Sequence, residues 1–201
     1  MNTLKYFFTF LFVTTLVGCG GGGGSNSGAG GGDLQRRIVV IGDSIGIGYN
    51  ASVAFPDLLE GLIGIEVINR SIGGASASRG AGMTPALIEE FKPMYLVVLL
   101  GTNNAGGPGG GVKGAIEAIN FAARIALQAG VIPIIGTIPP ITNSSDENDN
   151  VAAINAGIIS INGARIARIN QAVSPSDISD GTHPTDRGQR IIAQLFAEQV
   201  F

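Results

Sequence analysis

The sequence at residues 36–44 is RRIVVIGDS. Four consecutive β-branched residues, Ile38–Ile41, are typical of a strand that is buried on both faces. Gly42 ends the apolar run, and Ser44 follows on the turn after the strand. Strands that are apolar on both faces occur in parallel sheets covered by helices, so this stretch predicts an α/β protein.

Similar apolar runs follow along the chain, separated by stretches with helical spacing. The expected strands are 38–41, 65–68, 96–100, 131–135 and 164–169, and the expected helices are 51–62, 85–91, 112–129, 150–162 and 185–199. Thr84 is expected to cap the second helix ahead of Pro85, and Gly163 to end the fourth. Residues 106–111 and 141–148 are expected to be loops. Strands that alternate with helices imply parallel pairing and a layered fold.

The first 32 residues differ in composition from the rest. Lys5 precedes an apolar run, Tyr6–Val17, which is the order of an export signal. This run is shorter than the roughly 20 residues of a membrane-spanning helix, so we expect it to be removed. Residues 20–32 are almost all glycine and predict a flexible tether. Residues 33–201 then have the size of one ordinary domain.

The end of the apolar run, Leu16-Val17-Gly18-Cys19, resembles the lipobox of bacterial lipoproteins. The resemblance implies a signal peptide over 1–18, a lipid on Cys19 and a tether from Cys19 to residue 32. The protein would then be anchored in the bacterial cell envelope, in the outer membrane of a Gram-negative host because glycine follows the cysteine. The alternative is that Cys19 is an ordinary small residue of the signal. It is the only cysteine, so no intramolecular disulfide can form.

Charge and composition exclude several partners. The chain has 12 basic and 15 acidic residues, and removal of 1–18 would take away only Lys5, leaving 11 and 15. With no basic cluster, nucleic acid is not an expected partner. No group of histidine, cysteine and acidic residues has metal-ligand spacing, so we expect no metal and no cofactor. We expect a monomer.

Residues suited to nucleophilic catalysis lie where the expected strands end. Ligands of parallel sheets bind beyond the carboxyl ends of the strands, which is where Ser44 and Asn103 are found. His183 is the only histidine, so an imidazole base must be this residue. Asp180, three positions earlier, can orient its ring. The alternatives are that Ser44 caps a helix, that Asn103 serves a turn, and that Asp180 is a cap beside a solvent-facing histidine.

These motifs resemble the SGNH hydrolases, also called GDSL esterases or lipases, over essentially the whole domain. The resemblance implies a three-layer α/β/α sandwich with a flavodoxin-like parallel sheet of five strands. It implies that Ser44 of the Gly-Asp-Ser motif is the nucleophile, with Asp180 and His183 as its partners. The N–H groups of Ser44 and Gly74 and the side chain of Asn103 would form the oxyanion hole. The family usually has aspartate after this asparagine, whereas the sequence has Asn104.

The resemblance implies a serine ester hydrolase that cleaves a small acyl ester through an acyl-enzyme. Carbohydrate O-acetylesterase and lysophospholipase activities use the same chemistry and stay open, as does a binding lipoprotein that has kept the fold without turnover. The motif Gly42–Gly46 also satisfies the G-x-S-x-G pattern of α/β-hydrolases. That fold places several strands before its nucleophile, whereas only one is expected before Ser44.

Overall fold

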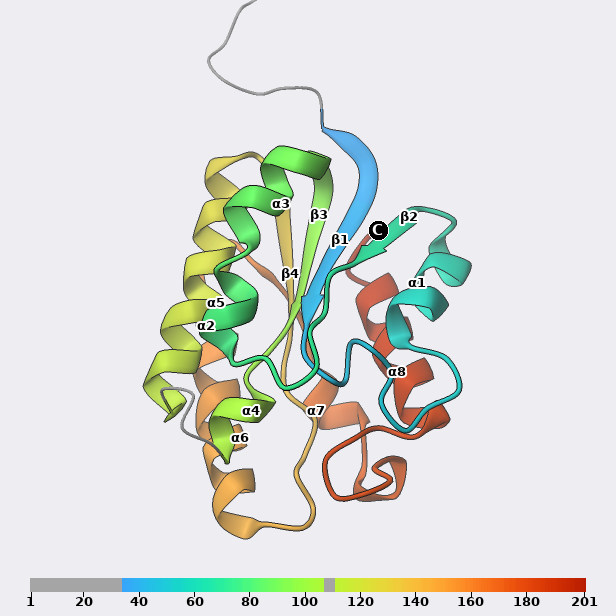
Figure 1. Cartoon of the computed structure of the whole chain (residues 1–201), viewed down its shortest axis with the longest axis vertical. Coiled ribbons are helices and arrows are strands. Elements are labelled where there is room, and N and C mark those ends of the chain that lie inside the picture. Colours follow the sequence, from blue (N-terminus) through green and yellow to red (C-terminus); the bar gives the residue numbers. More distant parts are fainter. Residues whose placement is uncertain (1–33, 107–110) are drawn as a thin grey trace, which may run out of the picture. The chain divides into compact units, whose positions relative to one another are not determined.

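The computed structural model describes residues 34–106 and 111–201 (Figure 1). The predicted signal peptide, Cys19 and the tether lie outside these residues, as does most of the expected loop at 106–111. Across both described ranges, no helix combines the length and apolar character needed to cross a membrane.

A five-stranded parallel sheet forms the centre of the domain. The strands are β1 (Gln35–Gly42), β2 (Glu66–Asn69), β3 (Pro93–Leu99), β4 (Ile132–Gly136) and β5 (Arg165–Ala167). Their order across the sheet is β2-β1-β3-β4-β5, and every neighbouring pair is parallel. The predicted five-stranded parallel sheet is therefore confirmed, with β1 and β3 in its interior.

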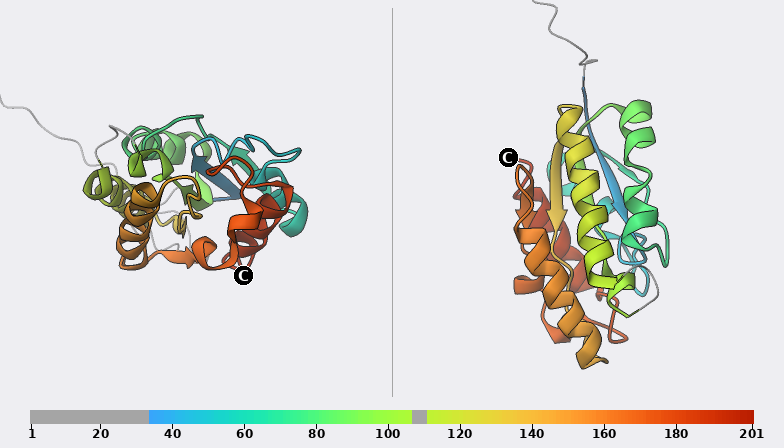
Figure 2. Two further views of the ribbon diagram at one scale, coloured as in Figure 1. Left: turned by 90° about the horizontal axis from the view of Figure 1, so that it is seen from below. Right: turned by 90° about the vertical axis from the view of Figure 1, so that its left-hand side faces the viewer.

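Helices cover both faces of the sheet (Figures 1 and 2). One layer contains α2 (Ala77–Ala81), α3 (Thr84–Phe91), α5 (Gly111–Gln128) and α6 (Ser145–Ile159). The other contains α1 (Phe55–Ile63), α7 (Ile169–Ala172) and α8 (Asp186–Ala197). Two short helices, α4 (Thr102–Ala105) and η1 (Pro175–Asp177), follow β3 and α7 along the chain.

Strand β1 supplies side chains to both hydrophobic cores. Val39 and Ile41 pack with the α2, α3, α5 and α6 layer, whereas Ile38 and Val40 pack with the α1 and α8 layer. All four are completely buried. Burial of a side chain of this size contributes roughly 1.5–3 kcal/mol, so β1 is fixed from both sides. The turn that follows it is held in place by the same packing.

Two expected helices differ from the observed ones at their ends. Helix α1 begins at Phe55 and not at residue 51, because Ser52 is bound elsewhere: its N–H and hydroxyl donate to Asp186 at 2.6 and 3.0 Å. Helix α6 begins at Ser145, within the expected 141–148 loop, and Ser144 caps it by accepting from the Glu147 N–H at 3.3 Å.

The predicted roles of Thr84 and Gly163 were wrong. Thr84 is the first residue of α3 and Met83 is its cap, and the buried Thr84 hydroxyl has no hydrogen-bond partner among the described residues. Helix α6 ends with Ser160 as its cap. Gly163 instead lies in the turn before β5, where its φ of +78° favours glycine.

Candidate active site

The candidate nucleophile lies on the turn after β1. Residues 44–50 form consecutive turns, and α1 starts only at Phe55 with Ala54 as its N-cap, so the alternative that Ser44 caps a helix does not hold. Backbone bonds such as Tyr49 N–H to the Ser44 carbonyl, at 3.0 Å, close these turns. Gly46 packs against Ser71, and a Cβ at Gly46 would collide with the Ser71 side chain. Because Gly46 has no side chain, the turn after β1 can lie directly against the loop that follows β2.

The structure brings Ser44, His183 and Asp180 together. The distance from Ser44 Oγ to His183 Nε2 is 2.9 Å, although 139 positions separate them in the sequence. His183 Nδ1 lies 2.8 Å from Asp180 Oδ2. With Nδ1 protonated and donating to the carboxylate, Nε2 carries the lone pair and accepts from the serine hydroxyl. The three side chains therefore form a continuous chain of two hydrogen bonds.

Asp180 is held as an anion. Burial alone would raise the pKa of its carboxyl. The pKa is instead lowered to about 2, because the carboxylate accepts hydrogen bonds from the His183 backbone N–H, the His183 ring and the Thr182 N–H, and because the charge of His183 favours the ionised form. Its side chain is 39 % exposed and that of His183 is 16 % exposed. The carboxylate is thus ionised at neutral pH and can stabilise an imidazolium.

The predicted oxyanion-hole residues lie on three segments at the carboxyl edge of the sheet: Ser44 follows β1, Gly74 follows β2, and Asn103 follows β3. Gly74 is exposed, with a φ of +68°, and a Cβ there would meet nothing within 4 Å. Asn103, in α4, donates from Nδ2 to the Ala75 carbonyl at 3.1 Å. Because an amide nitrogen carries two protons, one donor of Asn103 remains for a ligand. The bond to Ala75 places the Asn103 amide beside the Gly74 loop.

Asn104 connects α4 with the start of α2. It is buried, and its Oδ1 accepts from the Ala77 N–H at the start of α2 at 2.8 Å. An aspartate, usual in the family at this position, could accept the same hydrogen bond with a carboxylate oxygen. An asparagine in place of the family's usual aspartate therefore preserves this contact between α4 and α2.

Asp43, beside the nucleophile, is completely buried. Its Oδ1 accepts from the Ile45 N–H at 3.0 Å, and its Oδ2 has no hydrogen bond of normal geometry within the described residues. Burial raises the pKa of this carboxyl to about 6, although the Ile45 N–H, the adjacent Thr102 side chain and the charge of His183 favour its ionised form. Asp43 thus holds the turn that follows β1 through its hydrogen bond from the Ile45 N–H.

Several residues of this site could not be inferred from motifs. The Tyr49 ring lies 4.5 Å from the His183 ring, measured between centroids. Asn50 donates to Asp180 Oδ2 at 2.8 Å. Gln189, buried in α8, accepts from the Phe55 N–H at 2.9 Å and donates to the Ile45 carbonyl at 3.1 Å. The only signal was the position of Tyr49 and Asn50 shortly after the Gly-Asp-Ser motif.

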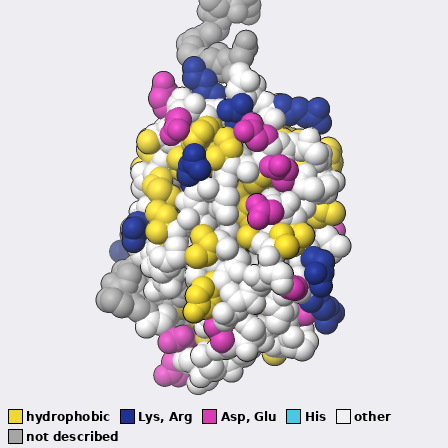
Figure 3. All heavy atoms as spheres, turned by 45° about the vertical axis from the view of Figure 1, so that its right-hand side comes forward, with side chains coloured by type: hydrophobic (Ala, Val, Ile, Leu, Met, Phe, Trp, Pro, Cys, Tyr) yellow, Lys and Arg dark blue, Asp and Glu magenta, His cyan; other side chains and the backbone are white. Residues whose placement is uncertain are grey.

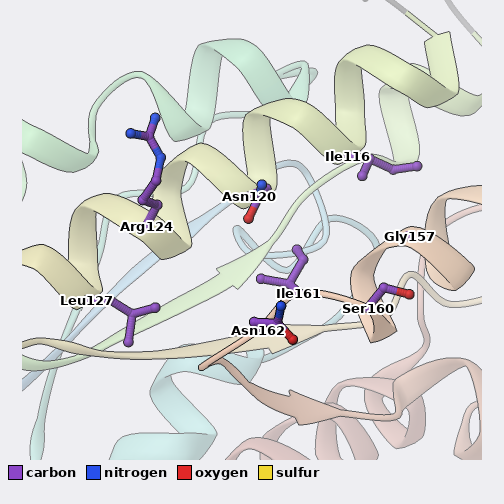
Figure 4. Close-up of a pocket in the computed structure, with 8 residues that line it drawn as sticks. All are labelled: Ile116, Asn120, Arg124, Leu127, Gly157, Ser160, Ile161 and Asn162. Atoms are coloured by element: carbon purple, nitrogen blue, oxygen red, sulfur yellow. The ribbon is translucent and has the colours of Figure 1, made fainter.

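Other features of the described residues do not form a second hydrolytic site. No group of three or more histidine, cysteine and acidic residues there could hold a metal ion. A cavity of about 430 Å³ lies between α5 and the end of α6, where Asn120, Arg124 and Ser160 line it (Figure 4). It contains no residue of the triad. The face in Figure 3 carries acidic and basic side chains interspersed with apolar ones.

The parallel α/β sandwich and the serine-histidine-aspartate arrangement at its carboxyl edge are those of a hydrolase of the SGNH type. Residues 40–191 match the model of the GDSL-like Lipase/Acylhydrolase family, and the chain belongs to this family.

Solved structures share the fold. A GDSL-like lipase from Bacteroides thetaiotaomicron superposes with a TM-score of 0.70 at 20% identity, over 83% of this chain and 89% of that one. The psychrotrophic esterase EstA from Pseudoalteromonas gives a TM-score of 0.64 at 17% identity, over 83% and 97% of the two chains.

A curated relative, "Thioesterase 1/protease 1/lysophospholipase L1" of Escherichia coli, is 35% identical over 71 residues. This match covers 33% of the present chain and spans only about a third, 34%, of the relative's length.

Proposed function

We propose that the protein is a serine hydrolase that cleaves carboxylic esters through an acyl-enzyme on Ser44. The observation that supports this most strongly is the 2.9 Å distance from Ser44 Oγ to His183 Nε2, in a ring whose Nδ1 is bound to Asp180. His183 accepts the serine proton as the hydroxyl oxygen attacks the ester carbonyl, then returns that proton to the leaving alcohol. Water, activated by the same imidazole, releases the acid and restores Ser44.

The negative charge of the tetrahedral intermediate falls on the former carbonyl oxygen. We assign its stabilisation to the N–H groups of Ser44 and Gly74 and to the second Nδ2 proton of Asn103. Donors fixed in advance at such a position contribute much of the acceleration of acyl transfer. The Asn103–Ala75 hydrogen bond supports the assignment because it restrains the amide before substrate arrives.

An apolar acyl group is the substrate feature that the surroundings of the site favour. Ile47, Tyr49 and Val53 are exposed by 47, 53 and 44 %, and all three lie on the segment that follows Ser44. Ile47 Cδ1 would lie 3.4 Å from a Cβ built on Gly73, beside the proposed oxyanion glycine. An acyl chain leaving the carbonyl carbon could cover these side chains and remove apolar surface from water.

A panel of nitrophenyl esters of increasing acyl length tests the proposed activity. We expect the protein to hydrolyse them and the Ser44→Ala variant to fall to the background rate, because the acyl-enzyme cannot form. Equal rates for the two proteins would refute the proposal and favour a binding protein that has kept the fold.

We also propose that the protein is exported and anchored in the bacterial envelope by a lipid on Cys19. The support is the sequence Leu16–Cys19 after a short apolar run, followed by the glycine-rich stretch to residue 32. An anchored esterase would act on acylated molecules of the envelope or its surroundings.

A further inference from the structure

The carboxylate of Asp180 accepts four hydrogen bonds. Its Oδ1 accepts from the Thr182 N–H at 3.0 Å and the His183 N–H at 2.8 Å, and its Oδ2 accepts from His183 Nδ1 and Asn50 Nδ2, both at 2.8 Å. A carboxylate offers about four acceptor positions, so every one is used. Three donors belong to the same turn as Asp180. The fourth, Asn50, is 130 positions away and lies on the segment that carries Ser44.

The backbone of Asn50 is held in an unusual conformation that supports this contact. Its φ is +63°, and among the described non-glycine residues only Lys92 shares a positive φ. Asparagine tolerates this region better than most residues, but the conformation still has to be maintained by its surroundings. Two positions later, both bonds from Ser52 to Asp186 fix the segment against the start of α8.

The chemistry of the contact defines the orientation of the amide. An ionised carboxylate can only accept, so the nitrogen of Asn50, and not its oxygen, faces Asp180. The same Asp180 oxygen accepts from the His183 ring, whose opposite nitrogen meets Ser44. Asn50 therefore restrains the shared acceptor and links the segment of the nucleophile to the turn of the base.

We propose that Asn50 is a positioning residue for ester hydrolysis: its amide fixes Asp180 Oδ2 and thereby keeps the His183 ring directed at Ser44. This inference rests on the proposed function. Asn50 touches none of the reacting atoms in this scheme and acts through Asp180. A small rotation of the base away from its partner lowers the rate because proton transfer depends on a short, aligned hydrogen bond.

The variant Asn50→Gly separates the amide from the backbone conformation, since glycine adopts positive φ readily. We expect kcat to fall about 10-fold, which is typical when a hydrogen-bond partner that orients a functional side chain is removed, and KM to stay nearly unchanged. Lys92→Gly is the matched control: it also replaces a non-glycine residue of positive φ, but at the opposite, amino edge of the sheet, before β3. It should keep the kcat of the wild-type protein.

Two further measurements distinguish positioning from folding. Because His183 is the only histidine, one imidazole Nδ1 proton signal reports the bond to Asp180 by NMR. We expect this signal to shift or broaden in Asn50→Gly and to be unchanged in Lys92→Gly. Asn50→Asp keeps a side chain of similar size that tolerates positive φ but brings a second carboxylate to Asp180, so its kcat at neutral pH should also fall.

Wild-type kcat and an unchanged Nδ1 signal in Asn50→Gly would overturn the inference, as would wild-type kcat in Asn50→Asp. A wild-type protein that hydrolyses no ester would refute the proposed function alone. The imidazole spectra would in that case still decide whether Asn50 orients the His183 ring.

Discussion

In the proposed mechanism, the base that activates the Ser44 hydroxyl comes from the far end of the chain. The His183 ring lies between Ser44 and Asp180, with 2.9 and 2.8 Å to its two partners. Neither distance requires a further movement before proton transfer. The proposed chemistry needs individual donors and acceptors, and each of them can be removed by a single substitution.

The Asn103→Ala variant removes the proposed side-chain donor of the oxyanion hole. We expect kcat to fall about 100- to 1000-fold with little change in KM, because the donor acts on charge that develops only in the transition state. Steady-state kinetics with a nitrophenyl ester measures both constants. Asn162→Ala, an exposed asparagine beside the cavity between α5 and α6, is a suitable control. Undiminished turnover in Asn103→Ala would remove this residue from the site.

Asp43 makes stability depend on pH. Its pKa is raised from 3.8 to about 6 by burial, so the folded protein holds a proton that the unfolded chain releases between pH 4 and 6. The free energy of unfolding should therefore fall as pH rises through this window, with a contribution from Asp43 of about 3 kcal/mol. The pKa values of Asp177, Asp180 and Asp186 are lowered, so these carboxylates act in the opposite direction, chiefly below pH 4.

Urea unfolding of the wild-type protein and Asp43→Asn at pH 4.5 and 7.5 tests this assignment. Relative to the wild type, the variant should be more stable at pH 7.5 than at pH 4.5, because it has no charge to bury. A stability difference that is the same at both pH values would contradict a raised pKa for Asp43.

At the scale of elements, the segment from Ile45 to Val53 packs against α8 on one side and exposes apolar side chains on the other. Its buried side binds α8 through Gln189, and Ile47, Tyr49 and Val53 are exposed. Of these three, Tyr49 lies against the His183 ring, and Ile47 lies near Gly73. Because its buried side is held against α8, this segment can keep its apolar side chains exposed to solvent. We expect it to bind the acyl part of the substrate.

The Ile47→Ser variant should lower kcat/KM more for long-chain esters than for acetate esters. Loss of a buried apolar contact of this size costs roughly 1–3 kcal/mol, or about 10- to 100-fold for the longest chain bound. Leu62→Ser, which alters a residue 54 % exposed in α1, is the control. The same loss for acetate and for long-chain esters would exclude Ile47 from acyl-chain binding.

The strands β1, β3 and β4 were predictable because each contains an apolar run that is buried on both faces. The edge strands β2 and β5 are shorter, partly polar and only partly buried. The short helices α2, α4 and α7 have only four or five residues each, too few for a helical period to be visible. The start of α6 was missed because its first turn, Ser145–Asn148, is polar and depends on the Ser144 cap. The triad residues could be proposed from motifs, whereas the contact of Asn50 depends on a loop conformation that no local pattern specifies.

At the scale of the whole molecule, β1 runs from the first described residues of the domain to the candidate site. Gln35 is the first residue of this strand, and Ser44 follows its carboxyl end. Eight residues at about 3.3 Å each give a separation of roughly 26 Å. The candidate site thus lies at the sheet edge opposite to the start of β1.

Replacement of Cys19 should therefore change location and not chemistry. We expect Cys19→Ala to move the protein from the membrane fraction to the soluble fraction of the envelope, with kcat on a soluble ester unchanged. Cell fractionation with immunoblotting gives the first result, and kinetics on the purified variant give the second. A Cys19→Ala protein that still fractionates with membranes would contradict the lipid anchor.

A fluorophosphonate probe measures directly whether the folded chain activates one hydroxyl. Peptide mass spectrometry of the inhibited protein should locate one phosphonate on Ser44, and His183→Ala should be labelled far more slowly because the base is missing. Complete loss of esterase activity with Ser44 unmodified would contradict the account.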